Sequence, residues 1–170
     1  VVNYKTVMSD AASGFTSVTY PFPVIRMADL YLMYAEALNE KGEDYATVLP
    51  WIDMVRERSG LQGVKESWDQ YVGNSKYATQ TGLRQIIMQE RRIELAFEGH
   101  YFWDVRRWKT ATTELTQPLT GWKVRYGETD VDYYSENLVL VRDFTPKMYF
   151  WPIDIGELRK DPNLVQNYGW

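Results

Sequence analysis

The stretch RQIIMQERRIELAFEGHYFWDVRRWK, residues Arg84–Lys109, predicts two helices that meet at Gly99. Apolar side chains recur at helical spacing in and just before its first half, at Leu83, Ile86, Ile87, Ile93 and Phe97. A stripe of this kind indicates that the first helix buries one face in a core. We therefore expect a mainly α-helical protein whose other elements pack around this stretch.

A row of carboxylates follows the same predicted helix, because Glu90, Glu94 and Glu98 lie at positions i, i+4 and i+8. Like charges at this spacing repel each other by about 0.2–0.5 kcal/mol per pair. We therefore expect cationic side chains to neutralise the row. Guanidinium groups can both pair with carboxylates and stack on the interleaved aromatic rings. The expected structural ion-pair network comprises Arg26, Glu36, Glu90, Arg91, Arg92, Glu94, Glu98, Asp104, Arg106 and Arg107.

The same glutamates have an enzymatic interpretation, since carboxylates on one helix face can bind a metal or act as an acid and base. The nearby arginines favour ion pairing instead. The single histidine, His100, has no cysteine or G-x-S-x-G serine to activate and too few partners for a zinc site. We predict no catalytic residue, no metal site and no cofactor. A glycan-active enzyme domain using Glu90 or Glu94 is the alternative.

Composition limits the classes of partner. The chain has 170 residues, 45% of them hydrophobic, which is enough for one domain with a core, so a single domain over residues 1–170 is expected. A net charge of −4 gives no support for nucleic acid binding. There is no cysteine for a disulfide or a thiolate metal site, and no run of residues is long enough to span a membrane.

Two further helices are predicted before the central stretch. The first covers Ile25–Asn39 and the second covers Val48–Ser59. Gly42 and Gly60 follow them at positions where glycine commonly ends a helix. Pro50 is expected in the first turn of the second helix, where its missing N–H costs nothing.

Two long polar segments, residues 62–82 and 110–137, are predicted to be irregular loops. Their aromatic rings can stack on the apolar faces of sugars or pin their own loops to the domain. We expect most to be buried anchors, with at most one or two exposed. The candidate ligand-binding residues are Trp68, Tyr71, Tyr77, Trp122, Tyr126, Tyr133 and Tyr134.

After these loops, a short strand is expected over Leu138–Val141. The C-terminal tail should then fold back over the helices through apolar anchors at Ile153, Leu158 and Leu164. The predicted fold is thus a set of helix pairs with long irregular loops and a wrapping tail.

Several motifs carry a resemblance to a known family. The segments Glu90–Leu95 (ERRIEL), Phe97–His100 (FEGH) and Trp103–Trp108 (WDVRRW) resemble the signature of the SusD/RagB family. Asp53–Leu61 (DMVRERSGL) and the closing segment Phe150–Asn167 resemble two further patterns of that family. After the histidine, the family usually has Arg-Tyr or Arg-Phe, where this chain has Tyr-Phe.

The resemblance implies tetratricopeptide-like helix pairs and a role in nutrient capture, most often of glycans, by a lipoprotein on the surface of the outer membrane. It also implies a SusC-like TonB-dependent transporter as partner. The signal peptide and lipid-acceptor cysteine of the family are absent here, so the chain is expected to be a C-terminal fragment that serves mainly as scaffold and transporter-facing surface. A generic helical-repeat interaction module is a further alternative.

Overall fold

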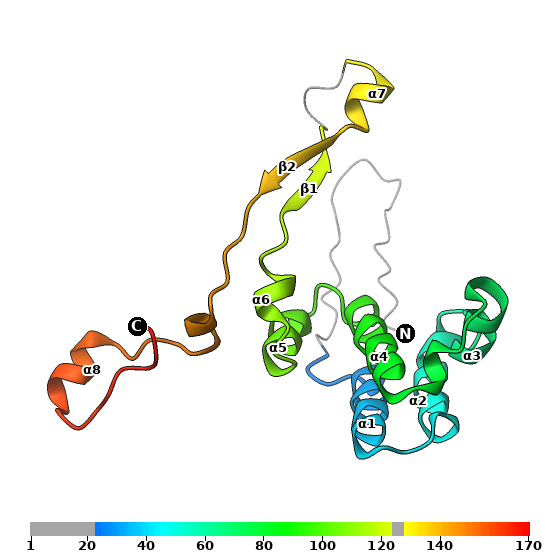
Figure 1. Cartoon of the computed structure of the whole chain (residues 1–170), viewed down its shortest axis with the longest axis horizontal. Coiled ribbons are helices and arrows are strands. Elements are labelled where there is room, and N and C mark those ends of the chain that lie inside the picture. The colour runs from blue at the N-terminus through cyan, green and yellow to red at the C-terminus, as the bar shows by residue number, and fades with distance from the viewer. Residues whose placement is uncertain (1–22, 124–127) are drawn as a thin grey trace, which may run out of the picture. The chain divides into compact units, whose positions relative to one another are not determined.

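The computed structural model describes residues 23–123 and 128–170 (Figure 1). The chain divides into two compact units, Val1–Glu94 (unit 1) and Leu95–Trp170 (unit 2), which are described separately below. This division does not test the expectation of a single domain, which stays a prediction. No helix within the described ranges is long and apolar enough to cross a membrane.

Three helices form the body of unit 1: α1 (Met27–Lys41), α2 (Tyr45–Arg58) and α4 (Gln80–Glu94). α1 contacts both of the others, and the three lie next to one another in Figure 1. Each contributes apolar side chains at helical spacing to one core. Its fully buried members include Leu32, Ala35, Val48, Ile52, Leu83 and Ile87. The prediction of a mainly α-helical fold is confirmed.

The apolar stripe of α4 is shorter than predicted. Ile93 is exposed, and Phe97, which lies beyond the end of α4, is fully exposed. Phe97 has a positive φ of 66°, so helical periodicity no longer determines where its side chain points. Gly99, with a φ of 82°, then starts the next helix. The predicted break at Gly99 is therefore correct, whereas the burial of Ile93 and Phe97 is not.

Both predicted glycine termini are present. Gly42 has a φ of 88°, and the N–H of Glu43 donates to the Leu38 carbonyl at 3.1 Å. After α2, Gly60 has a φ of 75°, and the N–H of Leu61 donates to the Arg56 carbonyl at 3.0 Å. These bonds satisfy carbonyls that the helix leaves without a partner, and the left-handed conformation favours glycine.

α2 starts earlier than predicted. Asp44 caps the helix, because its carboxylate accepts a hydrogen bond from the Ala46 N–H at 2.8 Å. Pro50 consequently lies inside the helix and not in its first turn. The residue is exposed, so the backbone carbonyl that loses an N–H partner there has access to water.

Residues 62–82 do not form the irregular loop that was predicted. They contain α3 (Val64–Ser67), a π-helical turn η1 (Trp68–Val72) and a 3-10 turn η2 (Lys76–Ala78). The buried side chains of Val64 and Tyr77 join the core of unit 1. Their burial, which depends on packing against distant helices, explains why the segment is ordered.

Unit 2 has a smaller core, made of Val105, Ala111 and Phe144. Its elements in chain order are α5 (His100–Arg107), α6 (Ala111–Glu114), β1 (Leu119–Trp122), α7 (Asp130–Tyr133), β2 (Glu136–Leu140), η3 (Pro146–Tyr149) and α8 (Ile155–Lys160). β1 and β2 pair as an antiparallel hairpin, with Trp122 opposite Glu136. The strand predicted at 138–141 thus starts two residues earlier and ends one residue earlier, and the predicted loop 110–137 contains α6, β1 and α7.

The tail packs against unit 2 only in part. Met148 and Tyr149 contact the small core, which places η3 beside α5 and α6. The Trp151 ring still lies under the Arg106 guanidinium of α5, 5.7 Å from it. Farther along the tail, the Gln166 side chain bonds both the N–H and the carbonyl of Ile153, at 2.8 and 2.9 Å. Leu164, a predicted anchor, is exposed.

Candidate functional site

Glu90 and Glu94 lie on the same face of α4 as Leu83 and Ile87. The four residues are spaced four, three and four positions apart, which places them on one side of a helix. Their side chains are only 14% and 12% exposed. The interior face of α4 therefore changes from apolar side chains to carboxylates over its last two turns. Such nearly buried charges require partners.

Arginines from two other parts of unit 1 provide these partners. Arg56 of α2 forms an ion pair with Glu90. Arg26, which precedes α1, and Arg58 of α2 both donate to Oε1 of Glu94, at 2.8 and 2.6 Å. Arg26 also donates to the Glu94 backbone carbonyl at 3.0 Å. The two carboxylates thus join the C-terminal end of α4 to α2 and to the start of α1.

The third glutamate of the predicted row does not continue it. α4 ends at Glu94, so Glu98 lies outside the helix and is exposed. Arg92 is exposed as well, whereas Glu36 is half-buried on α1. The i+8 relation in the sequence therefore does not place Glu98 on the same face as Glu90, because the helical geometry stops first.

A buried ion pair that sequence reasoning missed lies between α1 and α4. Nη1 of Arg91 donates to Oδ1 of Asp29 at 2.9 Å, and Arg91 is only 3% exposed. Arg91 was expected in the network, but Asp29, Arg56 and Arg58 were not. A signal for Asp29 was available, since it lies beside Ala28 and three residues before Leu32, on the buried side of α1.

The arginines of unit 2 behave differently from those of unit 1. Arg107 donates to the buried Asp104 carboxylate at 2.8 Å and lies over the Trp108 ring. Arg106 stacks on rings, with its guanidinium 4.2 Å from the Phe102 centroid and 5.2 Å from that of Phe144. Within unit 2, Arg107 therefore pairs with a carboxylate three residues away, and Arg106 packs against aromatic rings.

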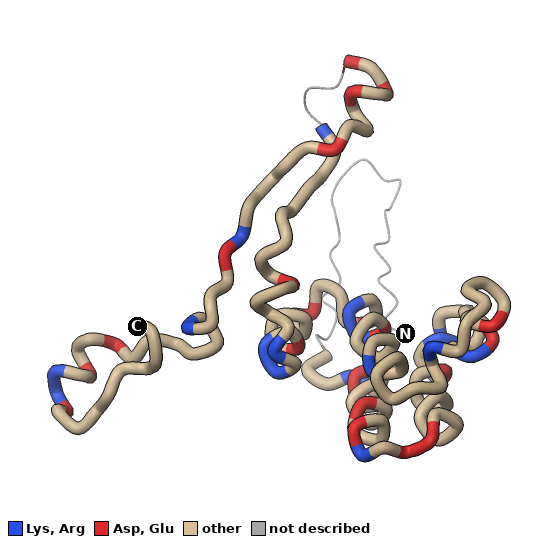
Figure 2. Tube along the Cα trace, in the orientation of Figure 1, with Lys and Arg blue, Asp and Glu red and all other residues tan. Residues whose placement is uncertain are grey.

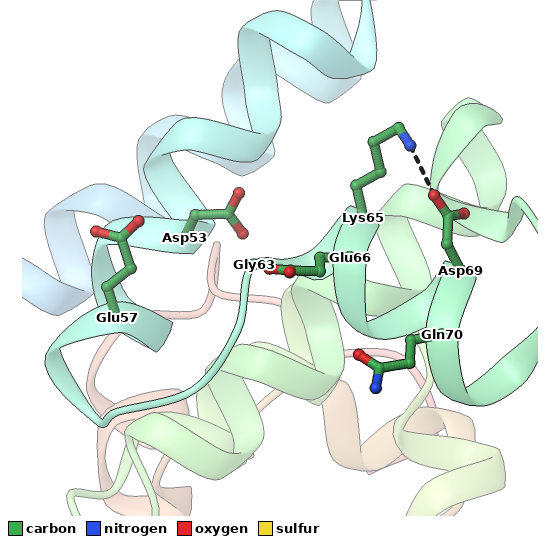
Figure 3. Close-up of a pocket in the computed structure, with 7 residues that line it drawn as sticks. All are labelled: Asp53, Glu57, Gly63, Lys65, Glu66, Asp69 and Gln70. Carbon is green, nitrogen blue, oxygen red and sulfur yellow. Dashed lines mark hydrogen bonds and ion pairs between the residues drawn. The ribbon is translucent and has the colours of Figure 1, made fainter.

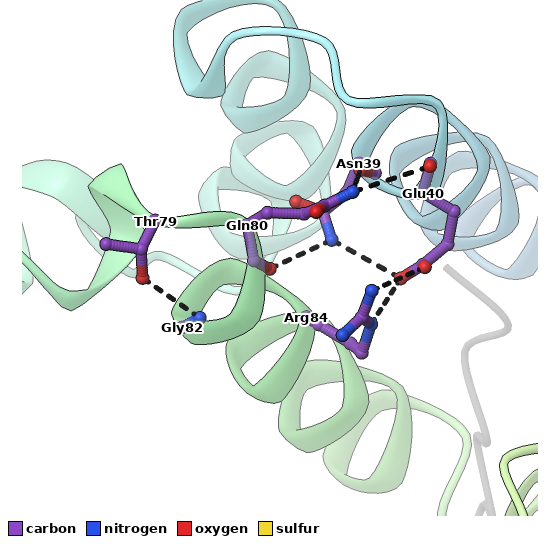
Figure 4. Close-up of polar contacts among 6 residues, drawn as sticks. All are labelled: Asn39, Glu40, Thr79, Gln80, Gly82 and Arg84. Atoms are coloured by element: carbon purple, nitrogen blue, oxygen red, sulfur yellow. Dashed lines mark hydrogen bonds and ion pairs between the residues drawn. The ribbon is translucent and has the colours of Figure 1, made fainter.

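A polar joint connects the C-terminal end of α1 to the start of α4 (Figure 4). The amides of Asn39 and Gln80 each donate to the backbone carbonyl of the other residue, at 3.1 and 2.7 Å. Arg84 donates twice to the Glu40 carboxylate, and these bonds lower the pKa of Glu40 below its ordinary value. The joint sets the register between the two helices and is structural in character.

An acidic hollow of about 670 Å³ lies between α2 and the α3–η1 segment (Figure 3). Its lining residues are Asp53, Glu57, Gly63, Lys65, Glu66, Asp69 and Gln70. Burial raises the pKa of Asp53, although a hydrogen bond from the Val64 N–H opposes the shift. Lys65 pairs with Asp69 at 2.6 Å and lowers the pKa of that carboxyl.

In chemical terms the hollow offers hydrogen-bond acceptors and repels anions. Across residues 23–123 and 128–170, no group of three or more His, Cys, Asp or Glu side chains is placed to hold a metal ion.

The candidate ligand-binding rings fall into two groups. In unit 1, Tyr77 is buried and donates to Asp69, Trp68 packs against the core, and Tyr71 is exposed. In unit 2, Trp122 and Tyr134 are exposed, Tyr133 is half-buried, and the three rings contact one another. Tyr126 lies outside the described residues.

Three of the six described rings are therefore exposed, so the expectation of at most one or two is wrong. Two of the three, Trp122 and Tyr134, lie in unit 2, whose core is too small to cover them, and the third, Tyr71, lies in the η1 turn of unit 1, which has no buried residue. Sequence spacing could not predict this, because burial of a loop ring depends on what packs against the loop.

Comparison with known proteins identifies the relatives of the chain. The model of the SusD family matches residues 1–170. SusD-like protein P25 of Formosa agariphila is 39% identical over 144 residues, which are 85% of this chain and 23% of that protein. SusD-like protein P2 of the same organism is 37% identical over 98 residues, 57% of this chain and 18% of that protein.

Two crystal structures from Bacteroides fragilis resemble the structure of this chain, each with a TM-score of 0.66 over 84% of its length. One is a SusD-like protein, 30% identical, of which 25% is covered. The other is a SusD-like carbohydrate-binding protein, 32% identical, of which 28% is covered. The chain thus spans about a quarter of the length of these relatives. Because the family model matches the chain from end to end, the chain belongs to the SusD family.

Proposed function

We propose that the chain is part of a glycan-binding protein on the outer-membrane surface, which delivers its ligand to a SusC-like TonB-dependent transporter. The observation that carries this proposal is the match of the SusD family model to all 170 residues. A 32% identical relative that is described as carbohydrate-binding supports glycans as the ligand class. The chain carries no more than about a quarter of such a protein, so it contributes mainly scaffold.

The arrangement of the glutamates supports binding over catalysis. A glycosidase needs two carboxyl groups that face the scissile bond, one of which gives up a proton to the leaving group. Here Oε1 of Glu94 accepts from two guanidinium groups, and Glu90 is paired with Arg56. These oxygens are engaged inside unit 1, where they hold helices together.

Binding and cleavage can be separated in one experiment. The purified chain is incubated with a panel of oligosaccharides, retention is measured by affinity electrophoresis, and released reducing ends are measured in parallel. We expect retention of at least one glycan with no release above the buffer background. Release of reducing ends that is abolished by Glu90→Gln, with the fold retained by circular dichroism, would support the enzyme alternative and contradict the proposal.

The transporter partnership has its own test. The chain and a purified SusC-like transporter encoded beside it are mixed in detergent and analysed by size-exclusion chromatography. Co-elution of the two proteins is the expected result, and an unrelated TonB-dependent transporter is the control. Separate elution at concentrations of about 10 μM, where a complex with a Kd of about 1 μM would persist, contradicts a transporter-facing role for this chain.

A further inference from the structure

We propose that Trp122, Tyr133 and Tyr134, hereafter the ring cluster, form a stacking platform for a neutral sugar ring at the end of the unit 2 hairpin. The inference rests on the proposed glycan-binding function and adds the place and the ligand class. It is carried by the geometry of the rings, by their exposure and by the charges around them.

The three rings hold one another in fixed orientations. The centroids of Trp122 and Tyr134 are 5.2 Å apart at an interplanar angle of 80°, and those of Tyr133 and Tyr134 are 4.9 Å apart at 80°. Trp122 and Tyr133 complete the triangle at 6.5 Å and 42°. Edge-to-face contacts of this kind are favourable and directional, so each ring restricts the rotamers of the others.

The backbone beneath the cluster is also constrained. Trp122 ends β1, and the N–H of its neighbour Lys123 donates to the Tyr133 carbonyl at 3.1 Å. α7 is capped by Thr129, whose hydroxyl accepts from the Asp132 N–H at 3.2 Å. These bonds tie the segment that carries the two tyrosines to the end of β1. The platform is therefore ordered before a ligand arrives, which limits the entropic cost of binding.

Exposure leaves ring surface available for stacking. Trp122 is 59% exposed and Tyr134 is 61% exposed, although both take part in ring contacts. In an edge-to-face pair only one of the two rings gives up a face, so the pair keeps free faces toward solvent. The C–H faces of a pyranose fit such surfaces. Carboxylates of Asp130 and Glu136 lie on the same hairpin, where they can accept hydrogen bonds from sugar hydroxyls.

The charges of the hairpin select against anionic sugars. Figure 2 shows acidic residues on α7, and residues 119–141 contain Glu128, Asp130, Asp132 and Glu136 against Lys123 and Arg125, which gives a net charge of 2 − 4 = −2. A uronic acid or a sulfated sugar would be repelled over a distance of about 10 Å at 0.1 M salt. A neutral pyranose avoids this repulsion, so the neutral class is the one the hairpin favours.

The test measures affinities of the 170-residue chain for neutral oligosaccharides by isothermal titration calorimetry. Trp122→Ala and Tyr134→Ala should each weaken binding about tenfold, while Trp122→Phe, which keeps a ring, should stay within about threefold of the wild type. Tyr34→Ala is the matched control, because Tyr34 on α1 is also an exposed ring, at 49%, and makes an edge-to-face contact with a tryptophan, Trp51. It should leave the affinity unchanged.

The ligand class is tested with a uronic-acid oligosaccharide of the same length. It should bind more weakly than the neutral one at about 0.01 M salt, and the difference should narrow at about 1 M, where charges are screened within about 3 Å. Tighter binding of the anionic oligosaccharide at low salt would overturn the assignment of the neutral class.

The outcomes separate this inference from the proposed function. If the wild-type chain retains glycans and the Trp122 and Tyr134 variants bind equally well, the platform is wrong while the glycan-binding function stands. If these variants bind sugars normally but lose co-elution with the transporter, the rings form a protein contact and the platform is likewise overturned. If the wild-type chain retains no neutral glycan, both fail. Should Trp122→Ala disturb the hairpin by circular dichroism, Tyr134→Ala and Trp122→Phe decide the question.

Discussion

The two units of this chain use similar side chains to different ends. In unit 1, three helices surround a continuous apolar core, and its ion pairs connect helices that are far apart in sequence, such as Asp29 with Arg91. In unit 2, three residues form the buried cluster, and ion pairs such as Glu157 with Lys160 are local. The β1–β2 hairpin is mostly exposed, including the apolar Leu138, Val139 and Leu140.

The difference shows how burial changes the contribution that an ion pair makes to stability. A charge pair inside unit 1 has lost its water, so removing one partner is costly. An exposed pair in unit 2 is screened and contributes about 0–1 kcal/mol. We therefore expect substitutions of the same kind to have large effects in unit 1 and small effects in unit 2, and the following predictions test that contrast.

The largest effect is expected from Asp29→Ala. The substitution removes an acidic partner of Arg91, which is 3% exposed. It should lower the free energy of unfolding of the helical unit 1 by about 3–5 kcal/mol. Urea unfolding followed by circular dichroism measures the change. The matched control, Glu157→Ala, removes an exposed partner of Lys160 and should cost less than about 1 kcal/mol. Equal losses in the two variants would contradict the comparison.

A second contrast concerns leucines. Leu32 is fully buried in the core of unit 1, so Leu32→Ala should lower the free energy of unfolding by about 2–5 kcal/mol through lost burial and a cavity. Leu138 on β2 is 56% exposed, and Leu138→Ala should stay within about 0.5 kcal/mol. The same urea titration compares both. A loss above about 2 kcal/mol for Leu138→Ala would mean that the hairpin is covered in solution.

A third contrast concerns two glycines that differ in how closely neighbouring atoms approach them. A Cβ added at Gly82 would lie 2.1 Å from the backbone carbonyl of Lys76, so Gly82→Ala forces the η2–α4 junction apart and should cost about 1–3 kcal/mol. At Gly121 in unit 2, the nearest atom is a methyl of Val139 at 3.3 Å, which can move. Thermal unfolding should show a clear decrease in Tm for the first variant and little change for the second. An unchanged Tm for Gly82→Ala would show that the junction yields easily.

The smallest effect concerns pH and Asp53. Burial raises the pKa of this carboxyl above its ordinary value of 3.8, so the protonated form contributes stability at low pH that is lost as the pH rises through the folded-state pKa. Asp53→Asn keeps an oxygen that can accept from the Val64 N–H and has no charge to bury.

Relative to the wild type, this variant should gain stability as the pH rises above about 3.8, by less than about 1 kcal/mol because the group is partly solvated. Urea titrations at several pH values measure the difference. If Asp53→Asn instead became less stable than the wild type as the pH rises, the folded protein would favour the charged form of Asp53.

The sequence by itself determined the features that depend on neighbours along the chain. Helical periodicity located α1, α2 and α4, and Gly42 and Gly60 marked the ends of α1 and α2, because a left-handed terminal residue is a local requirement. The break at Gly99 followed from the same reasoning. The motifs around these helices were also sufficient to indicate the family, since motifs are read directly from the order of residues.

Tertiary structure alone decided the features that depend on distant parts of the chain. The 62–82 segment is ordered because Val64 and Tyr77 enter a core built by other helices, which local composition does not reveal. The partners of Glu94 come from residues 36 and 68 positions away, so no spacing rule finds them. The exposure of Trp122 and Tyr134 likewise follows from how little of unit 2 packs against the hairpin, because burial is a property of the assembled fold and not of the residue.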